Sequence, residues 1–151
     1  MLLEVRGRPR AVAAGSTCDV PVTSTDFYPT WLEAAGLPPM PAQHCDGESL
    51  VPLLTRRAPL ARDALFWHYP HYGNQGGTPG SSVRQGNYKL IEFFEDGRLE
   101  LYNLSDDPGE KRNLALADAT RARAMHAILL DWQKKVAAKI PQTNLNWTPQ
   151  P

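Results

Sequence analysis

The stretch ALFWHYPHYGNQGGTPGSSVRQGNYKLIEFFEDGRLELYNL, residues 64–104, decides the fold of this chain. Its pattern predicts three strands and one long loop at residues 73–82, where four glycines and a proline exclude both helix and strand. Asp96 and Gly97 stand between two β-rich runs, which is the strongest short-range signal for a hairpin and predicts a type I′ turn. We therefore expect an antiparallel sheet that holds a loop with two histidines at its edge.

Helical signals flank this stretch on both sides. A helix is predicted over about 26–35, because Thr25 or Asp26 can cap its start and Gly36 suits the position just past its end. A long amphipathic helix is predicted over 117–139, where apolar residues recur at the helical period. These residues are Met125, Ile128, Leu129, Trp132, Val136 and Ile140.

Together these elements predict an α+β fold, with a small antiparallel sheet packed against a long C-terminal helix and preceded by a short helical segment. We divide the chain into residues 1–60, with a loop and the first helix, residues 61–141, with the sheet and the long helix, and a tail at 142–151. The four glycines of the loop do not form a phosphate-binding loop, because no Gly-Lys-Ser/Thr follows them.

Composition excludes several classes of partner. Sixteen basic and sixteen acidic side chains cancel, so charge gives no argument for nucleic acid or for an anionic membrane. No apolar run approaches the roughly 18 residues of a membrane span, and the start MLLEVRGRPR lacks the apolar core of a signal peptide. Cys18 and Cys45 permit at most one internal disulfide, and reduced thiols are an equal alternative.

His68, His71 and Arg84 are the candidate ligand-binding residues. Both histidines stand in Trp-His-Tyr-Pro-His-Tyr-Gly beside the glycine-rich loop, where imidazoles and aromatic rings suit ligand contact. Arg84, just beyond the loop, is expected to join them. The alternative is that each histidine caps a backbone group at a strand end. A metal site is disfavoured, because Pro70 prevents a helical arrangement of the two histidines and no third ligand stands nearby.

Several motifs, taken in order, resemble the C-terminal part of the sulfatase family. The matching segments are CDVPVTSTDFYPTWLEAAG at 18–36, DGESLVPLL at 46–54, ALFWHYPHYG at 64–73, VRQGNYKLI at 83–91 and ELYNLSDDPGEKRNLA at 100–115. The resemblance covers roughly residues 12–145 and looks closest to bacterial arylsulfatase-like and N-acetylgalactosamine-6-sulfatase-like members. It departs most from the family pattern at residues 1–11.

The resemblance implies the fold and chemistry of a formylglycine-dependent sulfuric ester hydrolase, whose full-length members are usually exported. In that family a formylglycine forms from the Cys or Ser of a C/S-x-P/A-x-R motif and works with Ca²⁺. Cys18 is followed by Asp-Val-Pro and Cys45 by Asp-Gly-Glu, so neither cysteine matches that motif. We expect no cofactor in this chain and place the catalytic machinery in a missing N-terminal sulfatase domain.

The function expected from this resemblance is substrate recognition without catalysis. The chain would contribute His68, His71 and Arg84 to the binding of a sulfate ester, such as a sulfated glycan, and would be inactive alone. Two alternatives stand beside it, namely a separate module that binds sulfated glycans or a protein partner, and a non-functional remnant of a truncated gene.

Overall fold

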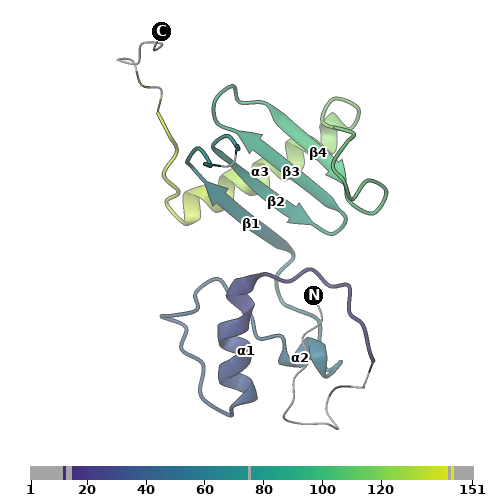
Figure 1. The fold of residues 1–151 in the computed structure, drawn as a ribbon, viewed down its shortest axis with the longest axis vertical. Coiled ribbons are helices and arrows are strands. Elements are labelled where there is room, and N and C mark those ends of the chain that lie inside the picture. The colour runs from purple at the N-terminus through teal and green to yellow at the C-terminus, as the bar shows by residue number, and fades with distance from the viewer. Residues whose placement is uncertain (1–11, 13–14, 75, 143, 145–151) are drawn as a thin grey trace. The chain divides into compact units, whose positions relative to one another are not determined.

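The computed structural model describes residue 12, residues 15–74, residues 76–142 and residue 144. The chain divides into two compact units, residues 1–63 and residues 64–151. Figure 1 shows the second unit as a sheet with one long helix, and the first as two short helices joined by irregular segments. No helix within the described residues is long and apolar enough to cross a membrane.

A four-stranded antiparallel sheet forms the second unit. Its strands are β1 (Ala64–Tyr69), β2 (Gly80–Gln85), β3 (Tyr88–Phe93) and β4 (Leu99–Asn103). Their order in the sheet is their order in the chain, so every neighbouring pair is joined by a hairpin connection. The predicted α+β class is confirmed.

The prediction of three strands was wrong, because β2 takes up part of the predicted loop. Gly80 and Ser81 pair with β1 on one side and with β3 on the other, so the glycine-rich loop ends at Pro79. Gly86 and Asn87 form a two-residue hairpin turn between β2 and β3, and Gly86 has a φ of 56°. A glycine in the first central position followed by Asn is a hairpin signal in its own right.

The predicted hairpin at Asp96-Gly97 is present, but its turn is longer than a type I′ turn. The amide of Gly97 donates to the carbonyl of Phe93, and the amide of Phe93 donates to the carbonyl of Arg98. Gly97 has a φ of 70°, whereas Asp96 does not enter the positive region. The loop therefore needs one glycine rather than two residues of positive φ.

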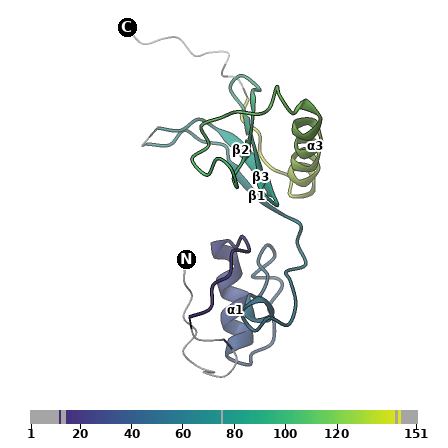
Figure 2. The ribbon, with the colours of Figure 1, turned by 90° about the vertical axis from the view of Figure 1, so that its right-hand side faces the viewer.

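The hydrophobic core of this unit lies between the sheet and α3 (Ala119–Lys135), and Figure 2 shows this helix along one side of the strands. The register places Phe66, Val83, Leu90 and Leu101 side by side in the middle of the four strands. The ring of Phe66 stacks on Trp132 of the helix at 4.9 Å between centroids. The buried core residues are Val83, Leu90, Leu101, Ala122, Met125 and Leu129.

The long helix is shorter than the predicted span of 117–139. Asp118 caps its start by accepting the amide of Arg121, and Ala137 ends it by taking a φ of 51°. The amides of Ala137 and Ala138 bond back to the carbonyls of Lys134 and Gln133, which satisfies the last turn. Val136 and Ile140, predicted on the apolar stripe, therefore lie beyond the helix and are exposed. Most of the predicted tail at 142–151 lies outside the described residues.

The first unit contains a short 3₁₀ helix, η1 (Ser24–Asp26), that runs into α1 (Phe27–Ala34), and a single turn, α2 (Val51–Leu54). Gly36 has a φ of 71° and the amide of Leu37 bonds to the carbonyl of Leu32, which is the predicted glycine-terminated helix end. Trp31 on α1 is 62% exposed, while Asp26 and Thr30 are buried.

Asp26 organises the first unit. Its carboxylate accepts two hydrogen bonds from the guanidinium of Arg62, at 2.5 and 2.6 Å, and one each from the amides of Thr23 and Glu48. Burial raises the pKa of this carboxyl, but these four donors outweigh burial and lower the pKa below its usual value. Arg62 is therefore tied to a fully buried acid 36 residues away in the sequence.

Candidate functional site

The β1–β2 loop, residues 70–79, is the candidate site. It is closed on itself, because the amide of Gly73 donates to the carbonyl of Gly77 and the amide of Gly76 donates back to Gly73. The amide of Phe94 donates to the carbonyl of Pro79, which joins the end of the loop to the β3–β4 turn. These bonds join Gly73, Gly76 and Gly77 to one another and Pro79 to the β3–β4 turn.

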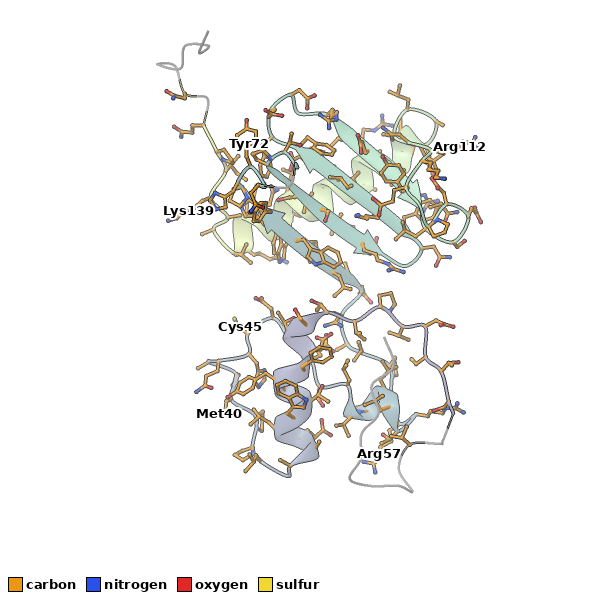
Figure 3. All side chains as sticks on the ribbon, in the orientation of Figure 1. Met40, Cys45, Arg57, Tyr72, Arg112 and Lys139 are labelled. Atoms are coloured by element: carbon orange, nitrogen blue, oxygen red, sulfur yellow. The ribbon has the colours of Figure 1, made fainter. Side chains whose placement is uncertain are left out.

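Exposed aromatic and imidazole side chains gather at the start of this loop. Tyr69 is 57% and Tyr72 is 68% exposed, and His71 is exposed between them. The ring of His71 meets Tyr69 edge-on at 5.5 Å between centroids. The hydroxyl of Tyr72 donates to the carboxylate of Glu95 at 2.7 Å, and this bond raises the pKa of Tyr72. Figure 3 labels Tyr72 beyond the end of β1.

His68 lies at the end of β1 and already has a partner for each ring nitrogen. Its Nδ1 lies 2.6 Å from the Ser81 hydroxyl, and its Nε2 lies 3.1 Å from the Lys139 carbonyl oxygen. The segment after α3 thus returns to the end of β1, and Figure 3 labels Lys139 near that strand end. The geometry fits the alternative weighed from the sequence, that this histidine caps a backbone group.

Arg84 does not join the histidines. Side chains alternate between the two faces of a strand, and His68 and Ser81 are directly paired on the face that α3 covers. Arg84 is three residues beyond Ser81 on β2, so it lies on the other face of the sheet. The intact sheet therefore separates His68 from Arg84, and the three predicted residues do not surround one ligand.

A second polar cluster on that other face was missed by the sequence reasoning. Lys89 donates to both carboxylate oxygens of Glu110, at 2.7 and 2.9 Å, and Glu110 holds a φ of 53°. Tyr102 donates to Glu100 at 2.7 Å, and burial together with this bond raises the pKa of Tyr102 to about 12. Lys89 and Tyr102 are directly paired across β3 and β4, a relation visible only once the register is known.

The remaining histidines have structural partners. His126, on α3, lies with its Nε2 2.9 Å from Glu92 Oε1, and Gln133 donates to the other oxygen of Glu92. His44 accepts the amide of Met40 and closes a turn in the first unit. Neither residue belongs to the β1–β2 loop.

The acidic, histidine and cysteine residues that the structure describes do not form a calcium site, and neither cysteine fits a formylglycine. Within the described parts of the chain, no three His, Cys, Asp or Glu side chains gather closely enough to hold an ion. Cys18 and Cys45 are both free and exposed, and neither is followed by the residues of the formylglycine motif.

Comparison with known proteins shows which family has this fold and these motifs. The family model described as N-sulphoglucosamine sulphohydrolase, C-terminal, matches residues 3–138. The chain belongs to the sulfatase family. What it represents is the C-terminal region of that family, since the matching model describes this region alone.

Curated relatives give the same result. A sulfatase of Formosa agariphila is 40% identical over 102 residues, which are 62% of this chain and 18% of the relative. An N-acetylglucosamine-6-O-sulfatase of Bacteroides thetaiotaomicron is 32% identical over 111 residues, which are 70% of this chain and 20% of the relative. This sulfatase C-terminal region thus spans about a fifth of the length of these relatives.

A solved structure shares the fold. BT4656, in complex with its substrate D-glucosamine-2-N,6-O-disulfate, superposes with a TM-score of 0.75 at 29% sequence identity. The match covers 88% of this chain and 28% of that one. The sheet and helix described above are therefore the C-terminal fold of sulfatases.

Proposed function

We propose that this chain is the substrate-recognition part of a sulfuric ester hydrolase and that the residues that break the sulfate ester belong to a region outside it. The observation that carries the proposal is the junction of β1 and the β1–β2 loop. It presents Tyr69 of the strand and His71 and Tyr72 of the loop to solvent, beside backbone hydrogen bonds within the loop. A loop with exposed aromatic and imidazole rings is suited to contact a sugar ring and an anion.

The roles we assign follow from each side chain's partners. The imidazole N–H of His71 is available to donate to a sulfate oxygen, and the faces of Tyr69 and Tyr72 suit the apolar face of a sugar. His68 is a positioning residue, because its bonds to Ser81 and to the Lys139 carbonyl fix the end of β1 from which the loop departs. Arg84, on the opposite face, is left out of this loop site.

The first experiment tests the absence of catalysis. The purified chain is incubated with a chromogenic aryl sulfate, with and without Ca²⁺, and product release is compared with that in buffer alone. We expect no turnover in either condition. Measurable hydrolysis by the pure chain would overturn the proposal.

The second experiment tests recognition directly. Histidine-ring NMR signals of the chain are followed during titration with D-glucosamine-2-N,6-O-disulfate, the sugar named for BT4656. We expect weak binding, with a Kd on the order of 1 mM, that shifts the His71 signal and is lost in His71→Ala. Asn74→Ala, exposed in the same loop, is the matched control and should bind as the unaltered chain does. Binding that leaves His71 unchanged, or no binding at all, would contradict the role of this loop.

A further inference from the structure

The four-stranded sheet has two edges, which β1 and β4 form (Figure 1). Along an edge strand every second residue bonds the neighbouring strand, and the residues between them direct their N–H and C=O groups away from the sheet. These outward groups take a partner from water, from the same chain or from another molecule. The two edges of this sheet differ in which partner they have.

The turn between β2 and β3 fixes which residues of β1 face outward. A two-residue hairpin loop is closed by a hydrogen-bonded pair, which here is Gln85 and Tyr88. Because bonded pairs alternate along a strand, β2 bonds β3 through its odd-numbered residues and β1 through its even-numbered ones. The residues of β1 paired with these even-numbered residues are Leu65, Trp67 and Tyr69. The outward residues of β1 are therefore Ala64, Phe66 and His68.

The β4 edge is covered by the chain itself. The side chain of Asn113 accepts the amide of Leu101 at 3.0 Å and donates to the carbonyl of Leu99 at 3.3 Å. The amide of Leu114 donates to the carbonyl of Leu101 at 2.7 Å. Asn113 and Leu114 thus bond three outward groups of β4, in the place that a fifth strand would take.

The β1 edge has no such cover. In the described part of the chain, no hydrogen bond reaches the outward amides and carbonyls of β1, and the Lys139 carbonyl bonds the ring of His68 rather than its backbone. Natural sheets protect an open edge with charged residues, proline or a bulge. The β1 sequence Ala-Leu-Phe-Trp-His-Tyr has no Lys, Arg, Asp, Glu or Pro, and its register with β2 is continuous. An unprotected apolar edge of this kind is one that another strand joins.

We propose that β1 pairs with β1 of a second copy of this chain, antiparallel and about a twofold axis at Phe66, so that the two sheets join into one. Around this axis Phe66 of each copy lies opposite Phe66 of the other, and Ala64 lies opposite His68. All three outward residues of each strand are then paired, with two hydrogen bonds for each pair. The proposal does not depend on ligand binding by the β1–β2 loop.

Neighbouring axes leave outward groups without a partner. An axis one residue later in β1 sets Ala64 opposite Pro70, which has no N–H to donate. An axis one residue earlier sets His68 opposite Arg62, whose amide already donates to the carboxylate of Glu48 at 2.9 Å. The axis at the centre of the strand is therefore the one that the backbone favours.

The side chains of β1 also suit a second copy. A twofold axis brings like charges together, and β1 carries no acidic side chain, lysine or arginine that could repel its counterpart. Trp67 of each copy lies opposite Leu65 of the other, which is a favourable cross-strand pair. Because Asn113 covers the β4 edge, the joined sheet ends in a covered strand on both sides. The assembly is thus a closed dimer, in which the same surface serves both copies.

Sedimentation velocity of the full 151-residue chain tests the pairing. As its concentration rises, we expect the mass to increase from 16.8 kDa toward twice that value, with a Kd on the order of 10 μM. Ala64→Pro removes an outward amide and no bond to β2, and should weaken association by about tenfold or more. Ala64→Ser keeps this amide and is the matched control, which should associate as the unaltered chain does. Thermal melts show that each variant is folded, and Ala64→Lys, a charged edge residue, carries the test if Ala64→Pro is not.

Hydrogen exchange at concentrations above and below this Kd locates the pairing. The outward amides of Phe66 and His68 should exchange several-fold more slowly in the dimer than in the monomer, whereas the amides of Leu65 and Trp67, which bond β2, should change far less. A monomer at every concentration, a dimer that Ala64→Pro leaves intact, or equal exchange of the outward amides in both states would overturn the proposal. So would association that continues beyond two copies, because the β4 edge would then be open as well.

Discussion

Each of the two units of this chain is stabilised internally by a different kind of interaction. In residues 64–142, six apolar residues between the sheet and α3 are buried, and four of them have no exposed surface, namely Val83, Leu90, Leu101 and Leu129. In the described residues 15–63 the fully buried side chains are the polar ones of Asp26 and Thr30, and the buried hydrophobic residues are Leu32 and Leu50. The first unit is therefore organised by hydrogen bonds to one carboxylate, and the second by a packed core. The first unit has few buried apolar residues, and its structure therefore depends on the ion pair between Asp26 and Arg62, which are far apart in the sequence.

The largest effect should come from the packed core. Leu90→Ala removes a fully buried side chain from the centre of the sheet, and we expect a loss of roughly 2–5 kcal/mol in the free energy of unfolding. Urea denaturation measures this loss. Hydrogen exchange of the folded variant should be faster than in the unaltered chain, both in the strands and in α3. Leu130→Ala, on the exposed side of the same helix, should change stability far less. Equal losses from both variants would contradict a core confined to the face under α3.

The next effect should come from the buried carboxylate. Asp26→Asn leaves Arg62 without its counter-charge and weakens the bonds from the amides of Thr23 and Glu48. We expect a loss of about 2–3 kcal/mol, somewhat below the figure for a wholly buried pair because the Arg62 side chain is 15% exposed. Hydrogen exchange of the α1 amides measures this loss in the stability of the first unit. Asp19→Asn, at an exposed acid, is the control. Similar exchange rates in both variants would show that Asp26 does not stabilise the first unit.

Acid should act on the first unit through the same residue. The pKa of Asp26 is lower in the folded chain than its ordinary value of 3.8, so the unfolded chain binds this proton first as the pH falls. The stabilisation is complete above the unfolded pKa, declines below about pH 4 and is lost once the pH passes below the folded pKa. Exchange rates of α1 amides between pH 6 and pH 2, with Asp26→Asn as reference, measure it. A profile equally steep in the variant would show that other groups cause the acid sensitivity.

The smallest effect should come from a turn. Gly86 holds a φ of 56° in the two-residue connection of β2 and β3, where a side chain is strained, so Gly86→Ala should cost about 1 kcal/mol. A thermal melt measures the change. Gly109→Ala is the matched control, because Gly109 is outside the positive-φ region and an added Cβ would meet chiefly the flexible Lys111 side chain. A larger cost at Gly109 would contradict this explanation.

The sequence predicted the features that depend on neighbouring residues. Gly36 and Pro38 mark the end of α1, and Asp96-Gly97 marks the β3–β4 hairpin, because backbone conformation in a turn is set by the residues within it. The α+β class follows from such local signals. Gly86-Asn87 is an equally local turn signal, and it marks the hairpin between β2 and β3.

The candidate site could be predicted only in part, for the same reason. The loop with His71 is a local feature, marked by its glycines. The partners of His68 are not local, since they come from β2 and from a residue 71 positions later in the chain. Placing Arg84 also requires the register of β2, because a shift of one residue moves every side chain of a strand to the other face.

Sequence alone thus determined the class of the fold, its turns and its family, because those depend on residues close together in the chain. Tertiary structure decided that Arg62 reaches Asp26, that Ala137 ends α3 early enough for the Lys139 carbonyl to meet His68, and that Arg84 lies on the face of the sheet opposite His68. Each of these depends on pairings between distant segments, which are fixed by the packing of the whole unit and not by any local pattern of residues.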